Sequence, residues 1–243
     1  EELILRAHTM QVDALAVTDH DTVAGLEEAH ATQAKQKRPL TIIDGVEIST
    51  SWHGFDIHVV GLNVDRHCPL FLARLKGQSE TRETRAQKIA EKLEKCGFEG
   101  VLPRAKALAG VGQVTRAHFA RVLVNNYGVP TMQAAFKKYL GKGKRAAVKA
   151  EWPSIETAIS WIQEAGGQAV LAHPAHYDMT AKWLRRLVAL FDQLGGDAIE
   201  TAFPGINKTK QELINELAEN HELLASAGSA FHFPSRWTEL GKN

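Results

Sequence analysis

Cysteine is scarce in this sequence of 243 residues, which contains only Cys68 and Cys96. The two lie apart and show no CxxC spacing, so neither a disulfide framework nor a thiolate metal site is indicated. This usage fits a reducing compartment, so we expect a cytoplasmic protein. The sequence also lacks the run of about 20 apolar residues that a membrane span needs, and no signal peptide is visible. We therefore expect no membrane partner.

The sequence also lacks an excess of charge of either sign. Its 29 Lys and Arg residues nearly balance its 28 Asp and Glu residues, so the net charge implies no field that would attract a polyanion. Recognition of a DNA sequence is not expected, and any phosphate must be bound locally. One local basic cluster is present, at Lys137–Lys138 and Lys142–Arg145. It is either a solvated loop or a phosphate clamp.

The stretch AVTDHDT, from Ala16 to Thr22, carries the first indication of chemistry. It completes an apolar run from Ala14 that predicts a short buried strand, and polar residues follow directly. Barrel proteins build their sites at the carboxyl ends of strands, where rigid backbone gives way to loops. By itself, His20 is explained equally well as a hydrogen-bonded loop histidine or as a metal ligand. Asp19 or Asp21 could orient its ring.

The same pattern of a polar residue in or after an apolar strand recurs downstream. A buried Glu is rare unless it is paired or bound to a metal, although each residue alone could be a core residue with a polar partner. Together, imidazole and carboxylate without thiolate suit Mn²⁺, Fe²⁺ or Zn²⁺ in a multi-metal site for phosphate ester hydrolysis. The sequence contains no nucleophile elbow, phosphate-binding loop or dinucleotide-binding fingerprint that would indicate a different activity. The candidate ligands are His20, Glu47, His58, His173 and His232.

Strands and helices alternate along the chain except in one segment. Residues 66–150 are charged and predicted to be helical, without convincing strands. We therefore expect a discontinuous α/β domain, 1–65 and 151–243, interrupted by a helical insertion. One helix of the insertion begins at the sequence VTRAH, which places Arg116 and His118 near the positive end of its dipole. The helices predicted in the insertion cover about 71–96, 102–109, 115–125 and 131–140.

Five motifs occur in order along the chain: TDHDT, GVEIST, HVVGLN, LAHP and GSAFH. With the insertion after the third, they resemble the PHP (polymerase and histidinol phosphatase) superfamily over essentially the whole chain. The closest resemblance is to the bacterial branch that hydrolyses nucleoside 3′,5′-bisphosphates and trims RNA from the 5′ end. It implies a distorted (β/α)7 barrel with a helical cap. Six strands can be counted, consistent with the first being missing from this sequence.

The resemblance also implies roles for particular residues. Two or three divalent ions, with manganese the first choice and iron or zinc possible, would be held by His20, Glu47, His58, His173 and His232. A metal-bound hydroxide would attack phosphorus, with His20, Glu47 and His232 as catalytic residues. The substrate would be a small phosphorylated nucleotide or an RNA 5′ end, whose phosphates would meet Arg116, His118, Lys144 and His176.

The chain departs from the family pattern at three places. The opening DxHxH motif is absent, because Glu1 already corresponds to the helix after it. Ala230 stands where the family has a ligand Asp, and His176 stands where relatives often carry a phosphate-binding Arg. Two alternatives therefore stay open. One is a histidinol-phosphate-type or cyclic phosphodiesterase on the same barrel, and the other is a catalytically impaired nucleotide- or RNA-binding relative.

Overall fold

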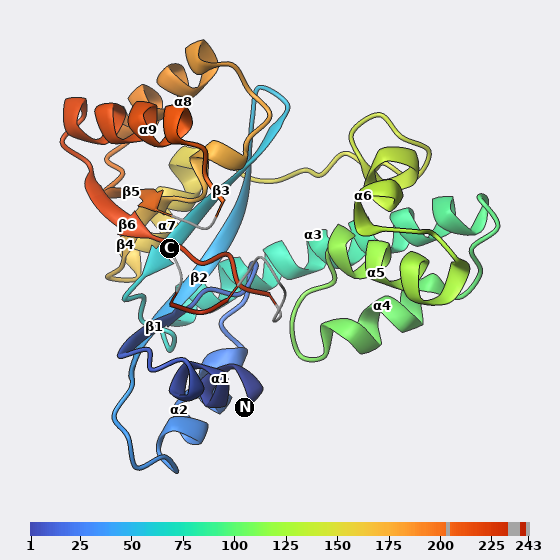
Figure 1. Cartoon of the computed structure of the whole chain (residues 1–243), viewed down its shortest axis with the longest axis horizontal. Coiled ribbons are helices and arrows are strands. Elements are labelled where there is room, and N and C mark those ends of the chain that lie inside the picture. Colours follow the sequence, from blue (N-terminus) through green and yellow to red (C-terminus); the bar gives the residue numbers. More distant parts are fainter. Residues whose placement is uncertain (203–204, 233–238, 242–243) are drawn as a thin grey trace. The chain divides into compact units, whose positions relative to one another are not determined.

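The computed structural model describes residues 1–202, 205–232 and 239–241, and the chain forms two compact units. Unit 1 consists of Glu1–Leu72 and Pro153–Asn243, and unit 2 of Ala73–Trp152. Within the described residues, every strand belongs to unit 1, whereas unit 2 is helical (Figure 1). None of the described helices is long and apolar enough to cross a membrane.

Unit 1 is built on a curled sheet of six strands, which are neighbours in the order of the sequence. The strands are β1 (Ala14–Val17), β2 (Thr41–Trp52), β3 (Phe55–Leu62), β4 (Gln168–Leu171), β5 (Ala198–Ala202) and β6 (Leu224–Ala227). The neighbouring pairs β1–β2, β4–β5 and β5–β6 are parallel. The predicted α/β class is thereby confirmed.

Strand β3 runs against both of its neighbours, which interrupts the parallel order of a regular (β/α) barrel. It forms a hairpin with β2 that closes at the pair Trp52 and Phe55. The two residues between them, His53 and Gly54, have φ angles of 46° and 77°. A two-residue turn in which both φ angles are positive has a backbone twist that matches the twist of the two strands it joins. The hairpin brings the middle of β2 next to the middle of β3.

Amphipathic helices cover the sheet of unit 1. In α8 (Ala181–Gln193) the buried residues Leu184, Leu187, Val188 and Phe191 recur at helical spacing and form one apolar face. Thr180 caps this helix by accepting a hydrogen bond from the N–H of Trp183. Helices α8 and α9 lie side by side (Figure 1). The helices of unit 1 are α1 (Glu2–Thr9), α2 (Gly25–Gln33), α7 (Ile155–Glu164), α8 (Ala181–Gln193), α9 (Lys208–Asn220) and the 3₁₀ turn η2 (Pro174–His176).

Unit 2 has its own buried core, with Leu93, Phe119 and Leu123 among its fully buried side chains. The single helix predicted at 131–140 ends in a wider π turn, in which the N–H of Gly141 donates to the carbonyl of Phe136 at 2.8 Å. A Cβ at position 141 would lie only 2.7 Å from that carbonyl oxygen, so the turn requires glycine. The helices are α3 (Pro69–Glu94, which begins in unit 1), α4 (Val101–Ala109), α5 (Arg116–Tyr127), α6 (Met132–Ala135) and η1 (Phe136–Leu140).

Candidate metal centre

Glu47, on β2, lies at the centre of a cluster of histidines in unit 1. Its Oε1 atom lies 2.8 Å from Nδ1 of His58 and 3.0 Å from Nε2 of His173. Its other oxygen, Oε2, lies 3.7 Å from Nδ1 of His20. The side chain of Glu47 is only 13% exposed. One largely buried carboxylate is therefore shared by three imidazole rings.

Backbone pairing places His20 beside Glu47. The N–H of Glu47 donates to the carbonyl of Asp19 at 3.0 Å, and the N–H of Asp21 donates to the carbonyl of Glu47 at 2.9 Å. His20 and Glu47 thus continue the parallel pairing of β1 with β2. The buried carboxylate of Asp21 accepts the N–H of Ser49 at 2.8 Å. Asp21 therefore ties the loop that carries His20 to β2.

The register of the β2–β3 hairpin places His58 next to Glu47. His58 pairs with Ser49, two residues beyond Glu47 on β2. Side chains two residues apart on a strand share a face, and diagonal neighbours across an antiparallel pair are within reach of each other. The N–H of His58 also donates to Oη of the buried Tyr177 at 2.9 Å. Burial raises the pKa of Tyr177 well above its ordinary value, so the phenol stays protonated.

His173 follows β4 and has a φ of 31°, in the left-handed region that few residues other than glycine adopt. Its N–H donates to Oε2 of Glu200, on β5, at 2.6 Å. Burial raises the pKa of Glu200, although its hydrogen bond from His173 acts in the opposite direction. A Cβ at Gly228 would collide with the Glu200 carboxylate, so glycine leaves the room that this carboxylate occupies. Glu200 thereby supports the unusual backbone at His173.

The electrostatics of the cluster depend on Glu47. Burial by itself raises the pKa of Glu47, but the charges of His20 and His58 and hydrogen bonds from His173 and His58 hold it well below its ordinary range. For His173, burial lowers the pKa, yet its hydrogen bond to Glu47 and the charges of Glu47 and Glu200 raise it overall. The carboxylate is therefore ionised at neutral pH and can act as an anionic ligand.

The donor atoms of this cluster fit a divalent metal ion. Ligand atoms about 2.0–2.2 Å from one ion lie about 3 Å from each other when they are at right angles, as in octahedral coordination, and the three atoms of Glu47, His58 and His173 are 2.8–3.2 Å apart. Donor atoms of His20, Glu47 and His58 all lie within 4.8 Å of one another. Nδ1 of His173 is buried and has no hydrogen-bond partner among the described residues. The set is imidazole plus carboxylate, as for Mn²⁺, Fe²⁺ or Zn²⁺.

The fifth predicted ligand, His232, lies beside this group rather than within it. The centroid of its ring is 6.2 Å from that of His20. The residue is exposed, and its Nδ1 atom lies 3.0 Å from the carbonyl oxygen of Ala230. Ala230 has a φ of 46°, a left-handed conformation in which Asp and Asn occur more readily than Ala.

His176, predicted to meet substrate phosphate, lies against the cluster. Its ring stacks on that of His173 with the centroids 5.6 Å apart. Burial lowers the pKa of His176, and the charges of His173 and Lys210 lower it further. A neutral imidazole is a weak anion ligand, so His176 is a poor electrostatic replacement for arginine.

The other predicted substrate residues, Arg116, His118 and Lys144, belong to unit 2. Arg116 is the first residue of α5. Nδ1 of His118 accepts the N–H of Thr115 at 3.0 Å, which closes a capping box at the start of this helix. Lys144 is exposed in the loop after η1. His118 therefore has a helix-capping role that the sequence pattern does not distinguish from ligand binding.

Sequence reasoning missed several residues of both units. Glu200 and Tyr177 support His173 and His58, and the polar Glu200 within the apolar strand β5 is the same signal that pointed to Glu47. In unit 2, Arg82 and Arg85 on α3 line a small hollow together with Arg116. They stand three residues apart, which places them on one helix face. Nothing else in the sequence indicates that Arg82 and Arg85 lie beside Arg116, which is more than 30 positions further along the chain.

The chain is similar in sequence to known proteins over nearly its whole length. No family model matches the chain. It is 49% identical over 242 residues to a 5′-3′ exoribonuclease from Haemophilus influenzae, covering 100% of this chain and 87% of the relative. It is 39% identical over 234 residues to a 3′,5′-nucleoside bisphosphate phosphatase from Chromobacterium violaceum, covering 96% of this chain and 81% of the relative.

A solved structure gives a similar result. The structure of an amidohydrolase from Chromobacterium violaceum, with bound sulfate and no metal, matches with a TM-score of 0.90. The identity is 38%, and the match covers 97% of this chain and 83% of that one. The similarity therefore extends over nearly all of the chain in sequence and in fold.

Proposed function

The chain belongs to the PHP superfamily of phosphoesterases, in the branch of the 5′-3′ exoribonucleases and 3′,5′-nucleoside bisphosphate phosphatases, and we propose that it is itself a metal-dependent hydrolase of such substrates. Its substrates would be nucleoside 3′,5′-bisphosphates and the 5′ ends of short RNA. One observation carries the metal-dependent chemistry: Oε1 of Glu47 lies within 3.0 Å of nitrogen atoms of both His58 and His173. The identities of 49% and 39% support the substrate class.

We assign the fold in finer detail as a distorted (β/α)7 barrel of PHP type with a helical cap. The curled sheet of unit 1 would form the barrel wall, and residues 66–150 would form the cap. The separation of unit 2 at Ala73–Trp152 supports this division. A cytoplasmic location fits both the substrate class and the two cysteines without disulfide spacing.

The metal ions would be held by His20, Glu47, His58, His173 and His232. We propose two or three Mn²⁺ ions, with Fe²⁺ or Zn²⁺ as alternatives. When bound, such ions acidify water and neutralise charge on phosphate oxygens. Both oxygens of Glu47 would be available as ligand atoms, because they face different histidines.

The chain's own groups would orient the ligands and bind the substrate. Tyr177 holds the backbone of His58, and Glu200 holds that of His173, so the main chain that carries each ring is positioned before any substrate arrives. The guanidinium of Arg116 would bind substrate phosphate and stabilise the charge that develops on it. Arg82 and Arg85, which line the same hollow, would add to this phosphate site, as would His118 and Lys144.

A second candidate is supported by Ala230, which stands where the family has a ligand Asp. Alanine has no atom that can bind a metal, so one coordination position would lack its protein ligand. In this candidate the chain binds nucleotides or RNA with impaired hydrolysis.

Phosphate release from adenosine 3′,5′-bisphosphate tests both candidates. We expect release with Mn²⁺ that stops when a chelator is added, and mononucleotides from 5′-phosphorylated RNA under the same conditions. Binding without release by this chain, together with phosphate release by the Ala230→Asp variant, would establish the impaired relative. Neither binding nor release with Mn²⁺, Fe²⁺ or Zn²⁺ would contradict the proposed function.

A further inference from the structure

We propose that an aromatic pocket in unit 2 binds an unstacked base of a single RNA strand, with Lys138 and Arg104 meeting the adjoining phosphates. The proposal rests on the proposed function and extends it. It adds a subsite that an RNA strand would occupy and that hydrolysis of a nucleoside bisphosphate does not require.

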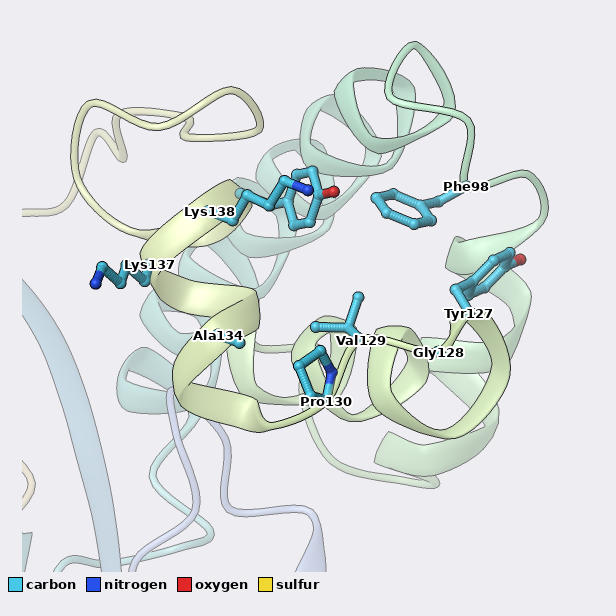
Figure 2. A pocket seen from close by; sticks show the side chains of 9 residues that line it. Phe98, Tyr127, Gly128, Val129, Pro130, Ala134, Lys137 and Lys138 are labelled. Carbon is cyan, nitrogen blue, oxygen red and sulfur yellow. The ribbon is translucent and has the colours of Figure 1, made fainter.

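The pocket is a cavity of about 670 Å³ beside α5, α6 and η1. This volume lies within the range of small-molecule sites. The ring of Phe98 packs edge-on against Tyr127 and Tyr139, with centroids 5.3 Å and 4.9 Å apart. Val129 and Pro130 form another part of the lining, and Figure 2 shows them across the cavity from Phe98. The cavity therefore offers aromatic and apolar surface to a flat ring.

Two cations stand over the aromatic rings of this pocket. Nζ of Lys138 lies 5.2 Å from the centroid of the Tyr139 ring, and the guanidinium carbon of Arg104 lies 5.3 Å from that of Tyr127. Arg104 also donates to Oη of Tyr127. In Figure 2 the Lys138 side chain extends along the cavity, whereas that of Lys137 points the other way. Among the described residues, none that lines the cavity is acidic.

Unit 2 as a whole has the charge of a polyanion-binding surface. Residues 73–152 contain 17 Lys and Arg against 6 Asp and Glu, a formal charge of +11, although the complete chain carries only +1. The remaining residues therefore carry −10. The near-neutral total conceals this segregation. A strongly basic unit attracts nucleic acid through its phosphates, whatever the net charge of the rest of the chain.

Aromatic rings combined with cations fit a single strand better than other ligands. Single-stranded RNA is bound by stacking its splayed bases on aromatic side chains while basic groups follow the backbone. A duplex keeps its bases stacked and offers none to a pocket. An apolar peptide or a second copy of the chain would use the apolar lining but has no need of the two cations. We therefore commit to an RNA strand as the occupant.

Binding of a 12-nucleotide 5′-phosphorylated RNA to the complete chain tests the proposal. Chelator is included to prevent cleavage, and fluorescence anisotropy gives the Kd. Phe98→Leu keeps apolar volume but removes a ring face, and Ala134→Phe fills the cavity without removing core atoms. We expect each to weaken RNA binding by about tenfold, since stacking of one base accounts for about 5- to 150-fold. Turnover of adenosine 3′,5′-bisphosphate should stay within about twofold of wild type.

Lys138→Ala and Lys88→Ala form the matched control pair, because each removes one exposed positive charge from unit 2. We expect the Lys138 variant to weaken binding several-fold more than the Lys88 variant. Equal losses in both would mean that only the net charge matters and would overturn the pocket as a site. So would wild-type affinity in both Phe98→Leu and Ala134→Phe, provided that their melting temperatures show folded protein. Sedimentation experiments in which self-association of the protein displaces the RNA would also overturn the pocket as an RNA site.

The two proposals fail in distinguishable ways. Loss of RNA binding in the pocket variants with no bisphosphate turnover in wild type would support the subsite and contradict the hydrolase. Bisphosphate turnover with RNA affinity unaffected by the pocket variants would support the hydrolase and overturn the subsite. A probe with 2-aminopurine in the RNA adds a direct readout, because stacking on Phe98 changes its fluorescence.

Discussion

The main-chain N–H of His173 lies 2.6 Å from Oε2 of Glu200, a residue 27 positions further along the chain. This bond fixes a histidine whose φ of 31° is unfavourable for any side chain with a Cβ. The imidazole of His173 in turn reaches Glu47 at 3.0 Å. Glu200 therefore acts on the candidate metal centre through the backbone rather than as a ligand.

Glu200→Ala should lower metal affinity by about 10–100-fold, the usual effect of losing an outer partner of a metal ligand. The reason is that His173 loses the acceptor that holds its backbone in place. The Kd for Mn²⁺, measured by competition with a chelating dye, checks this. Glu200→Gln is the matched control, because its amide oxygen can still accept the bond, and it should bind Mn²⁺ more tightly than the alanine variant. Equal affinities in both variants would contradict the positioning role.

Glu47→Gln should reduce metal content and phosphate release together. The amide keeps the shape of the side chain but removes the negative charge that His20, His58 and His173 surround. We expect a larger loss of metal affinity than for Glu200→Ala. Elemental analysis gives the metal content, and Glu219→Gln on the exposed face of α9 controls for loss of charge. Unchanged metal content would remove Glu47 from the ligand set.

Mn²⁺ should stabilise the folded chain, because the ligand set is assembled only when the protein is folded. At 100 times its Kd the ion contributes about 2.7 kcal/mol, which corresponds to a rise in Tm of about 5–10 °C for a chain of this size. Differential scanning calorimetry with and without chelator measures the shift. It should vanish in Glu47→Gln, and a shift of equal size in that variant would place the ion elsewhere.

Arg116→Ala should lower kcat/KM for adenosine 3′,5′-bisphosphate while metal content stays constant. A charge-assisted phosphate contact is worth on the order of 1.5–3 kcal/mol, so the loss should be about 10- to 150-fold. Arg116→Lys keeps the charge but not the bidentate geometry. Its kcat/KM should therefore lie between the values of the wild type and the alanine variant. Loss of metal in the alanine variant would mean that Arg116 acts on the metal centre instead.

Ala230→Asp should raise Mn²⁺ content and turnover together. The left-handed backbone at this position accepts Asp more readily than Ala, so the substitution is compatible with the fold. Ala230→Asn has the same shape without the charge and should gain far less. If metal content and turnover both stay at wild-type values in the Asp variant, the missing ligand at position 230 limits neither metal binding nor turnover in this protein.

The sequence by itself determined the α/β class, the order of strands and helices and the family. Apolar runs of four to eight residues produce strands, and helical spacing of residues such as Leu184, Leu187 and Val188 produces amphipathic helices, because both depend on local periodicity. The motifs that resemble the PHP superfamily are also local in sequence. Polar residues within apolar strands could therefore be singled out in advance.

Only the tertiary structure decided which partners these residues have. The reversed direction of β3 and its register put His58 diagonal to Glu47, and no pattern in either strand specifies that register alone. Glu200 meets His173, and Arg82 lines a hollow with Arg116, through contacts between segments distant in sequence. Packing of remote segments determines these relationships, and local periodicity carries no information about them.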